Sequence, residues 1–257
     1  MAQYKKENFK REEPAENLVA GRNAVKELLS TDTTVDKLLV QSGQREGSVI
    51  PLIAKARERG IPVIDTDKRK LDMICGGSYH QGIVAFCAAK EYCSVDDIIE
   101  IARARGEKPL IAVLDGIEDP RNLGAIIRCA EGAGAHGVII SKRHSAGLSP
   151  VAVKTSAGAL EHMAVAKVSN IASTVESLKE KGIWTFCADM DGENYTKAPF
   201  DRAVAIVLGN EGEGVSKLVK ERCDYTVSIP MYGKVSSLNV SASAGILLYA
   251  AKNMQIK

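Results

Sequence analysis

Two hydrophobic patterns alternate along this chain. In its second part, short runs such as residues 111–114 and 203–208 are apolar throughout, without the polar alternation of a strand that has one wet face. Segments with apolar residues three or four positions apart separate these runs, as in amphipathic helices. The pattern predicts an α/β domain over residues 109–257, built on a parallel β-sheet with helices on both faces.

The expected strands of this domain are short and apolar, at residues 110–117, 137–141, 164–168, 183–188, 203–208 and 225–229. The expected helices occupy residues 123–131, a segment beginning near 149–150, 171–181, 215–223, and about 237 to 253. Parallel sheets bind ligands at the carboxyl ends of their strands, so polar residues just after the strands are the first candidates for function.

Residues 18–90 also alternate between helix and strand, which predicts a small α/β sandwich. Helices are expected around residues 24–29, 52–59 and 68–70, and strands at 35–41, 61–65 and 82–89. Residues 91–108 begin with Ser94 and Asp97, spaced as in a capping box, and are expected to form a helical linker. Residues 1–17 contain no apolar run, and their four basic and four acidic residues predict a solvated tail.

Composition narrows the function. Lys and Arg number 34 against 32 Asp and Glu, so the net charge of +2 argues against a protein that binds nucleic acid by bulk charge. Residues 18–90 carry the largest local excess, +3. No secretory signal and no apolar run of membrane-helix length are found, so a cytoplasmic protein is expected. The six cysteines form no CxxC pair and no His lies at ligand spacing, so no metal site is expected.

Three motif-like patterns lack the context that their chemistry needs. Gly132, Gly134 and Gly137 match a dinucleotide-binding pattern, but the expected helix precedes them and the strand follows, so Gly132 and Gly134 are interpreted as helix-stop residues. The loop from Gly209 to Gly214 has the glycine spacing of a phosphate loop but lacks its Lys. Residues 241–245 lack the first Gly of a nucleophile elbow.

Three other segments each follow an expected strand and carry polar residues. The first contains Asn122, a candidate helix cap, and Arg128. The second is LGNEGEGVS at residues 208–216, whose glycines suggest unusual backbone angles or close approach to a ligand. The third, IPMYGKVSSLNVSASAG at residues 229–245, contains Ser237 and Asn239. All three are expected at one edge of the sheet.

Together these segments resemble the three motifs of the SpoU (TrmH) RNA ribose 2′-O-methyltransferases, in the same order and over residues 110–257. Residues 20–24 and 80–82 resemble the ribosomal-protein-like RNA-binding domain of one branch, the RlmB-like 23S rRNA guanosine-2′-O-methyltransferases. The resemblance implies an α/β fold with a trefoil knot, S-adenosylmethionine as cofactor, and a homodimer with its active site near the subunit interface. A tRNA target and a non-catalytic RNA-binding or ribosome-assembly protein remain alternatives.

The resemblance also assigns roles to residues. The catalytic set comprises Arg128, Asn122, Glu211, Ser237 and Asn239. The cofactor is expected against Leu208, Gly209, Ile229, Met231, Ser237 and Leu238, bound largely through main-chain groups. RNA contacts in the first domain are expected from Arg22, Lys68, Arg69, His80 and Gln81. A bidentate pair between Glu211 and Arg128 is a further expectation.

Overall fold

The computed structural model describes residues 17–31, 33–43, 48–75 and 80–256. The chain divides into two compact units, Met1–Cys87 and Ala88–Lys257, which are described separately. The expected tail, residues 1–17, lies outside the described residues except for Asn17. The Nδ2 of Asn17 donates to the Cys87 carbonyl at 2.7 Å, so this residue belongs to the first unit.

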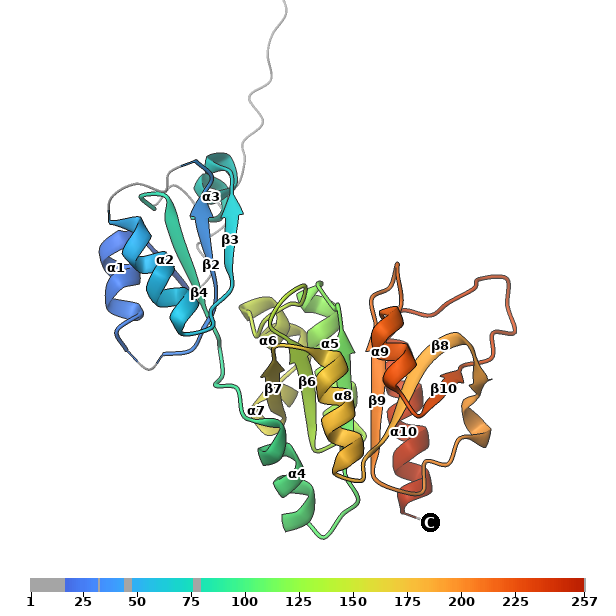
Figure 1. The fold of residues 1–257 in the computed structure, drawn as a ribbon. Coiled ribbons are helices and arrows are strands. Elements are labelled where there is room, and N and C mark those ends of the chain that lie inside the picture. The colour runs from blue at the N-terminus through green and yellow to red at the C-terminus, as the bar shows by residue number, and fades with distance from the viewer. Residues whose placement is uncertain (1–16, 32, 44–47, 76–79, 257) are drawn as a thin grey trace, which may run out of the picture. The chain divides into compact units, whose positions relative to one another are not determined.

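The first unit is a four-stranded sheet in the order β1-β4-β2-β3, with helices on both faces (Figure 1). Its elements are β1 (Leu18–Ala20), α1 (Arg22–Leu28), β2 (Val35–Gln41), α2 (Val49–Glu58), β3 (Val63–Thr66), α3 (Lys68–Ile74) and β4 (Ile83–Cys87). β2 pairs parallel with β3 and antiparallel with β4, which also pairs antiparallel with β1. Apolar residues of α1 and α2 pack on one face, and Leu71 and Cys75 of α3 pack on the other.

Two elements of this unit differ from the expectation. Helix α2 begins at Val49 instead of near residue 52 and includes Pro51 in its first turn. Proline is tolerated there because the N–H groups of the first turn have no carbonyl partner within the helix, so the missing N–H costs no hydrogen bond. Strand β1 was not expected, since only three residues form it and its pairing with β4 is nonlocal.

The second unit is a six-stranded parallel sheet in the order β10-β8-β9-β5-β6-β7. Its strands are β5 (Leu110–Asp115), β6 (Gly137–Ser141), β7 (Ala164–Val168), β8 (Trp184–Asn194), β9 (Val204–Gly209) and β10 (Tyr225–Ser228). Its helices are α4 (Val95–Ala104), α5 (Pro120–Gly132), α6 (Pro150–Ser156), α7 (Ala159–His162), α8 (Ile171–Glu180), α9 (Lys217–Arg222) and α10 (Val240–Gln255), with the short helix η1 (Tyr195–Lys197). The prediction of a parallel α/β sheet is confirmed.

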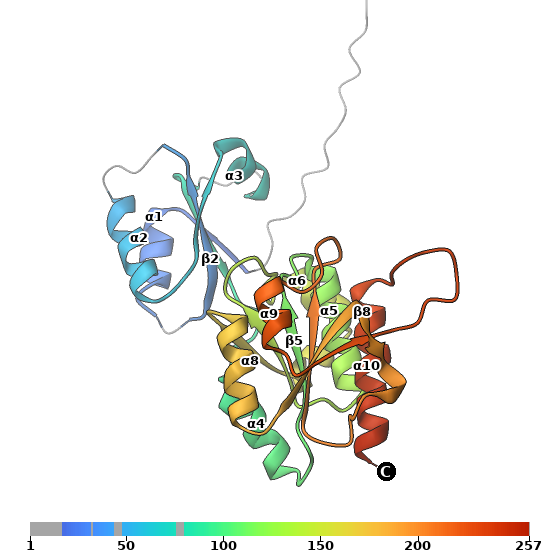
Figure 2. The same cartoon turned by 45° about the vertical axis from the view of Figure 1, so that its right-hand side comes forward.

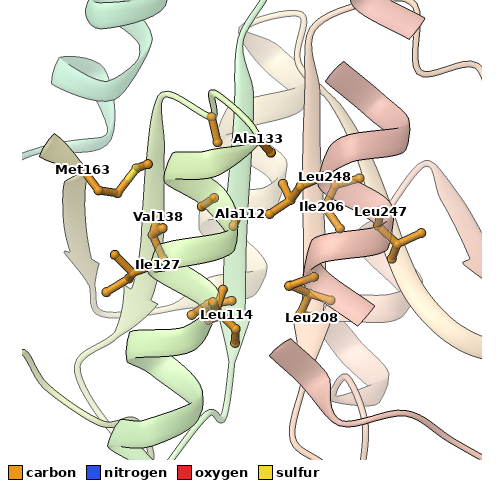
Figure 3. Packing of buried hydrophobic residues seen from close by; sticks show 14 of the residues in the cluster. Ala112, Leu114, Ile127, Ala133, Val138, Met163, Ile206, Leu208, Leu247 and Leu248 are labelled. Carbon is orange, nitrogen blue, oxygen red and sulfur yellow. The ribbon is translucent and has the colours of Figure 1, made fainter. Parts of the chain in front are cut away.

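Both faces of this sheet are covered, which explains the strands that are apolar throughout. Leu110, Ala112 and Leu114 of β5 pack with α5, α6, α7 and α10, as Figure 3 shows for part of this cluster. Ile111 and Val113 of the same strand point to the opposite face and pack with α4, α8 and α9. Figures 1 and 2 show these two helical layers. The expected trefoil knot stays a prediction.

Residues 91–108 contribute to the core of the second unit. The capping box is present, with Ser94 and Asp97 bonded reciprocally at the start of α4. Ile98 of this helix is fully buried in the core, and a Cβ on Gly137 would lie 2.6 Å from its side chain. The expected linker is therefore a helix that needs the sheet to bury its apolar side.

Helix α5 ends as the glycine pattern predicts. Gly134 has φ +70° and follows the C-cap Ala133, and the Ala135 N–H donates to the Ala130 carbonyl at 2.8 Å. This is a Schellman-type end, in which glycine takes the left-handed position. The dinucleotide-like pattern is thus a helix terminus followed by β6.

A histidine is buried in the core of this unit, between the start of β5 and the residues after α4. The side chain of His136 has no exposed surface, its Nδ1 accepts from the Leu110 N–H at 3.0 Å, and its Nε2 lies 3.3 Å from Glu107 Oε2. Burial lowers the pKa of His136 and outweighs the opposing effect of Glu107; Arg105 and Lys252 lower it further. The neutral ring is therefore the form that the folded protein favours.

We expect the free energy of unfolding to fall as the pH decreases below about 6.5, because the unfolded chain then binds a proton that the folded chain resists. His136→Asn keeps an acceptor near the Leu110 N–H and removes the titration, so its unfolding free energy should change less over the same pH range. Urea unfolding between about pH 7.5 and 5 measures this. Equal pH dependence in the two proteins would contradict it.

Candidate active site

The three candidate segments meet at one edge of the parallel sheet. Residues 116–119 connect β5 to α5, residues 210–216 connect β9 to α9, and residues 229–239 connect β10 to α10. Because all the strands are parallel, these connections leave from the same edge, and β9 lies directly beside β5. The predicted gathering of the segments is confirmed.

The loop after β9 is closed on itself by its own backbone. The Asn210 N–H donates to the Gly214 carbonyl at 3.1 Å, and the Gly214 N–H donates to the Asn210 carbonyl at 2.8 Å. A Cβ on Gly209 would lie 2.0 Å from the backbone carbon of Gly214, and Gly214 has φ +73°. Both glycines are needed for this close approach of backbone to backbone.

Asn210 and Asp115 tie this loop to β5, although neither was singled out from the sequence. The Asn210 side chain donates to the Gly116 carbonyl at 3.0 Å and accepts from the Gly212 N–H at 2.8 Å. Asp115 Oδ2 accepts from the Ser216 N–H at 2.8 Å. Asp115 is the first polar residue after the apolar run of β5, and Asn210 directly follows β9, which was the available signal.

Asn239 joins all three segments. Its Nδ2 donates to Asn122 Oδ1 at 3.0 Å and to Glu211 Oε1 at 2.6 Å. Its Oδ1 accepts from the Ser241 N–H at 2.9 Å and the Ser241 hydroxyl at 2.5 Å, which caps α10. Two donor and two acceptor positions are therefore all in use inside the site.

Two helix starts correct the expectations. Helix α5 is capped by Asp119, which accepts from the Arg121 N–H at 2.8 Å, and not by Asn122. Pro120 opens the helix because its fixed φ suits the first helical position, so Asn122 lies inside the first turn. Helix α10 begins at Val240, after Asn239, and leaves Ser237 in the preceding loop.

Arg128 and Ser237 are exposed, and neither has a hydrogen bond or ion pair within the described residues. The expected pair between Glu211 and Arg128 is wrong for this structure, since the Glu211 carboxylate accepts from Asn239 instead. Arg128 lies on the exposed side of α5, between the buried Ile127 and the half-buried Cys129. Its guanidinium is thus free of internal partners within the described residues.

The positions expected to hold the cofactor lie at the ends of β9 and β10. Leu208 is buried and Gly209 half-buried; Ile229 and Met231 are half-buried, and Ser237 and Leu238 are exposed. No hydrogen bond involving the backbone of residues 229–238 is found within the described part of the chain. The backbone N–H and C=O groups of this segment are therefore available to a ligand with donors and acceptors, such as an adenine ring. These residues fit the expected cofactor, S-adenosylmethionine.

In the first unit, Arg22 and Gln81 lie together and His80 is buried. Arg22 Nε donates to the Gln81 carbonyl at 3.1 Å, and Lys68 and Arg69 are exposed on α3. His80 is only 5% exposed; its Nε2 lies 2.9 Å from Asp72 Oδ1 and its Nδ1 accepts from the Gly82 N–H. Direct RNA contact by His80 is therefore a wrong expectation, because both ring nitrogens hold the turn before β4.

A depression of about 300 Å³ also opens on the first unit. Lys37 and Phe86 line it together with β3 and α3, and none of the five residues expected to contact RNA is among its lining residues. Its two lysines are matched by two aspartates, Asp65 and Asp67, so its charge favours no particular ligand.

Comparison with known proteins decides the family. Residues 109–249 match the model of the SpoU rRNA Methylase family, and residues 18–93 match a model described as RNA 2'-O ribose methyltransferase substrate binding. The chain belongs to the SpoU methylase family. The resemblance seen in the sequence is confirmed, and the second unit is the methylase domain.

Relatives of this SpoU methylase cover both of its units. A Bacillus subtilis protein, YacO, named as a TrmH family tRNA/rRNA methyltransferase, is 42% identical over 90% of this chain and 93% of its own. The SpoU methyltransferase AviRb from Streptomyces viridochromogenes, crystallised in complex with the cofactor AdoMet, is 28% identical, with a TM-score of 0.58 over 93% of this chain and 90% of AviRb. The A. aeolicus TrmH/SpoU tRNA modifying enzyme is 26% identical, with a TM-score of 0.53 over 62% of this chain and 83% of its own.

The described part of this SpoU methylase contains no helix that is both long and apolar enough to cross a membrane. The same residues contain no group of three or more His, Cys, Asp or Glu side chains arranged to hold a metal ion.

Asn239 variants test the junction of the three segments. Asn239→Ser retains a capping oxygen but loses both donor bonds, whereas Asn239→Asp retains the cap and brings a second carboxylate against Glu211. We expect melting temperatures in the order wild type, Ser, Asp at pH 8, with a total loss of about 1–3 kcal/mol for Asp. The loss of stability in Asn239→Asp should become smaller at lower pH, because one of the two carboxylates is then protonated. Equal stability of the Asp variant and wild type would show that the contact with Glu211 is absent.

Proposed function

We propose that this chain methylates a ribose 2′-hydroxyl of RNA with S-adenosylmethionine, and that its target is a guanosine of 23S rRNA. The observation that carries the proposal is the junction at Asn239, which gathers Asn122 and Glu211 at the sheet edge of a SpoU methylase domain. Bound S-adenosylmethionine supplies an electrophilic methyl group. Leu208, Gly209, Ile229, Met231, Ser237 and Leu238 would hold it.

Arg128 acts on the substrate oxygen. A ribose hydroxyl is a weak nucleophile until its proton is lost or shared, so negative charge develops on the 2′ oxygen during transfer. A guanidinium keeps its proton at physiological pH, so it stabilises this charge and clamps the adjacent phosphate rather than acting as the base. The free, exposed side chain of Arg128 suits both tasks.

The two asparagines have different tasks. The Oδ1 of Asn122 accepts from Asn239, so its Nδ2 donors are left for a ribose or phosphate oxygen of the substrate. Asn239 has no hydrogen-bonding capacity left and acts as a positioning residue. Asn239, which the resemblance assigns to the catalytic set, is therefore proposed to act by positioning the other residues.

Two observations support rRNA over tRNA. The family whose model matches residues 109–249 is described as rRNA methylase. The A. aeolicus tRNA enzyme corresponds to only 62% of this chain, against 93% for AviRb, so much of this chain is extra to a tRNA enzyme of that kind. RNA of defined shape is recognised through phosphates and hydroxyls, which needs no large net charge.

A cytoplasmic homodimer with its active site near the subunit interface is part of the proposal. Tyr232, Val235 and Leu238 are 94%, 67% and 37% exposed in the loop that ends at Asn239. Exposed large apolar side chains within one short segment are typical of interaction surfaces.

The test of the function is a map of 2′-O-methyl groups on rRNA and tRNA from cells with and without the gene. One guanosine of 23S rRNA should lose its methyl group when the gene is deleted, and the purified protein should restore it in vitro. Loss of a methyl group from tRNA instead would support the alternative target. RNA binding without any methyl transfer would support a non-catalytic assembly role.

Replacing Arg128 separates chemistry from cofactor binding. Arg128→Ala should slow methyl transfer by about 10²–10³-fold, because a donor aimed at the developing charge is lost. Arg128→Lys keeps the charge but not the planar fork and should be only partly active. Calorimetric titration with S-adenosylmethionine should give the wild-type affinity for both variants. Full activity of the Ala variant would refute the role.

A further inference from the structure

The loop between β6 and α6, residues 142–149, lies beside the active-site loops. β6 is the neighbour of β5 in the parallel sheet, so this loop leaves from the same edge as residues 116–119. The Ala146 N–H donates to the Ile117 carbonyl at 2.7 Å, which joins the two loops directly. Residues 116–119 lead into the helix that carries Asn122 and Arg128.

Hydrogen bonds on both sides hold this loop in one shape. The Lys142 N–H donates to the Val168 carbonyl at 2.7 Å, and the Ser141 hydroxyl donates to the Arg143 carbonyl at 2.5 Å. His144 has φ +51°, a left-handed conformation that costs free energy for a residue with a Cβ. Such strain persists only where neighbouring contacts impose it, and it concentrates at functional sites.

The loop of residues 142–149 carries an exposed arginine, Arg143. Within the described residues its side chain has no hydrogen bond or ion pair. The adjacent His144 lies 3.7 Å from Glu118 Oε1, an exposed contact of little energetic weight. Arg121, at the start of α5, is a second exposed cation at this edge.

We propose that Arg143 binds a backbone phosphate of the substrate RNA next to the methylated nucleotide, as a substrate-binding residue beyond the motif residues. This inference rests on the proposed RNA methylation. A guanidinium fork matches two phosphate oxygens, and phosphate contacts set the position of a nucleic acid without reading its sequence. The braced loop keeps the cost of ordering low, because the backbone of Arg143 is already fixed before RNA arrives.

Arg143→Ala tests the contact against a matched control. Arg105 is also exposed, but it follows α4 and precedes the first residue of β5, so it lies at the opposite edge of the sheet. The substrate is ribosomal RNA extracted from cells that lack the gene, with radiolabelled S-adenosylmethionine. We expect Arg143→Ala to raise the KM for RNA about tenfold, with kcat and cofactor affinity unchanged. Arg105→Ala should behave as wild type.

The salt dependence identifies the partner as phosphate. Losing one phosphate contact should make the plot of log affinity against log salt concentration shallower by about 0.7–0.9. Arg143→Lys should restore most of this slope but only part of the affinity, because a lysine lacks the bidentate fork. An unchanged slope in Arg143→Ala, or a KM equal to that of Arg105→Ala, would overturn the inference.

Filter binding of the same RNA separates this inference from the proposed function. If wild-type protein transfers no methyl group, the proposed function fails. Weaker RNA binding by Arg143→Ala than by Arg105→Ala would then still support the phosphate contact. If wild type methylates RNA and the two variants bind it equally, the inference fails and the function stands. Thermal unfolding should show Arg143→Ala and Arg143→Lys as stable as wild type, since the Arg143 side chain has no hydrogen bond or ion pair within the described residues.

Discussion

The active site depends on one constraint, the parallel direction of every strand in the second unit. Parallel strands bring their carboxyl ends to a common edge, so the connections after β5, β9 and β10 meet although they are far apart in the chain. A parallel sheet must be covered by helices on both of its faces. In β5, Leu114 packs against one helical layer and Val113 against the other. The core and the site are thus two consequences of the same sheet.

Asn239 converts this proximity into a fixed geometry. A single amide donates to Asn122 and Glu211 while its oxygen caps α10, so the start of the last helix and the two other segments are set by one group. All hydrogen-bonding groups of the Asn239 side chain are engaged inside the protein, so Asn239 can position other residues but has no donor or acceptor left for a substrate. Arg128 and Arg143 have no hydrogen bond or ion pair within the described residues, and they are the groups proposed to contact the substrate.

The strands whose bounds were predicted correctly from the sequence are those that coincide with an apolar run. The bounds of β2, β6 and β7 agree with expectation, because polar or helix-ending residues interrupt the apolar run at the ends of each strand. Strand β8 was expected to end at residue 188 but continues to Asn194, since its polar second half is held by pairing with β10. The register shifts between Thr226 and Val227, and a Cβ on Gly192 would lie 2.5 Å from the Val227 backbone. Such nonlocal pairing leaves no hydrophobic signal.

The residues that meet at the site were predicted from the sequence, but their hydrogen-bond partners were not. Glu211, Asn122 and Asn239 do meet, yet Glu211 bonds to an amide rather than to Arg128, because chain position does not determine which polar group lies within reach. His80 was misjudged for a related reason. A histidine beside a glycine turn looks exposed in sequence, but Asp72 and the Gly82 N–H occupy both its nitrogens.

The near-neutral net charge of the chain does not show which charged groups are already engaged inside the protein. Three acidic residues at the sheet edge have internal partners: Asp115 holds the loop after β9, Asp119 caps α5, and Glu211 accepts from Asn239, whereas Glu118 and Glu213 are exposed. A carboxylate bound to N–H donors offsets local partial charge and repels a phosphate less than its formal charge suggests. The guanidinium groups proposed to bind RNA can therefore act with more effective positive charge than the total of +2 implies.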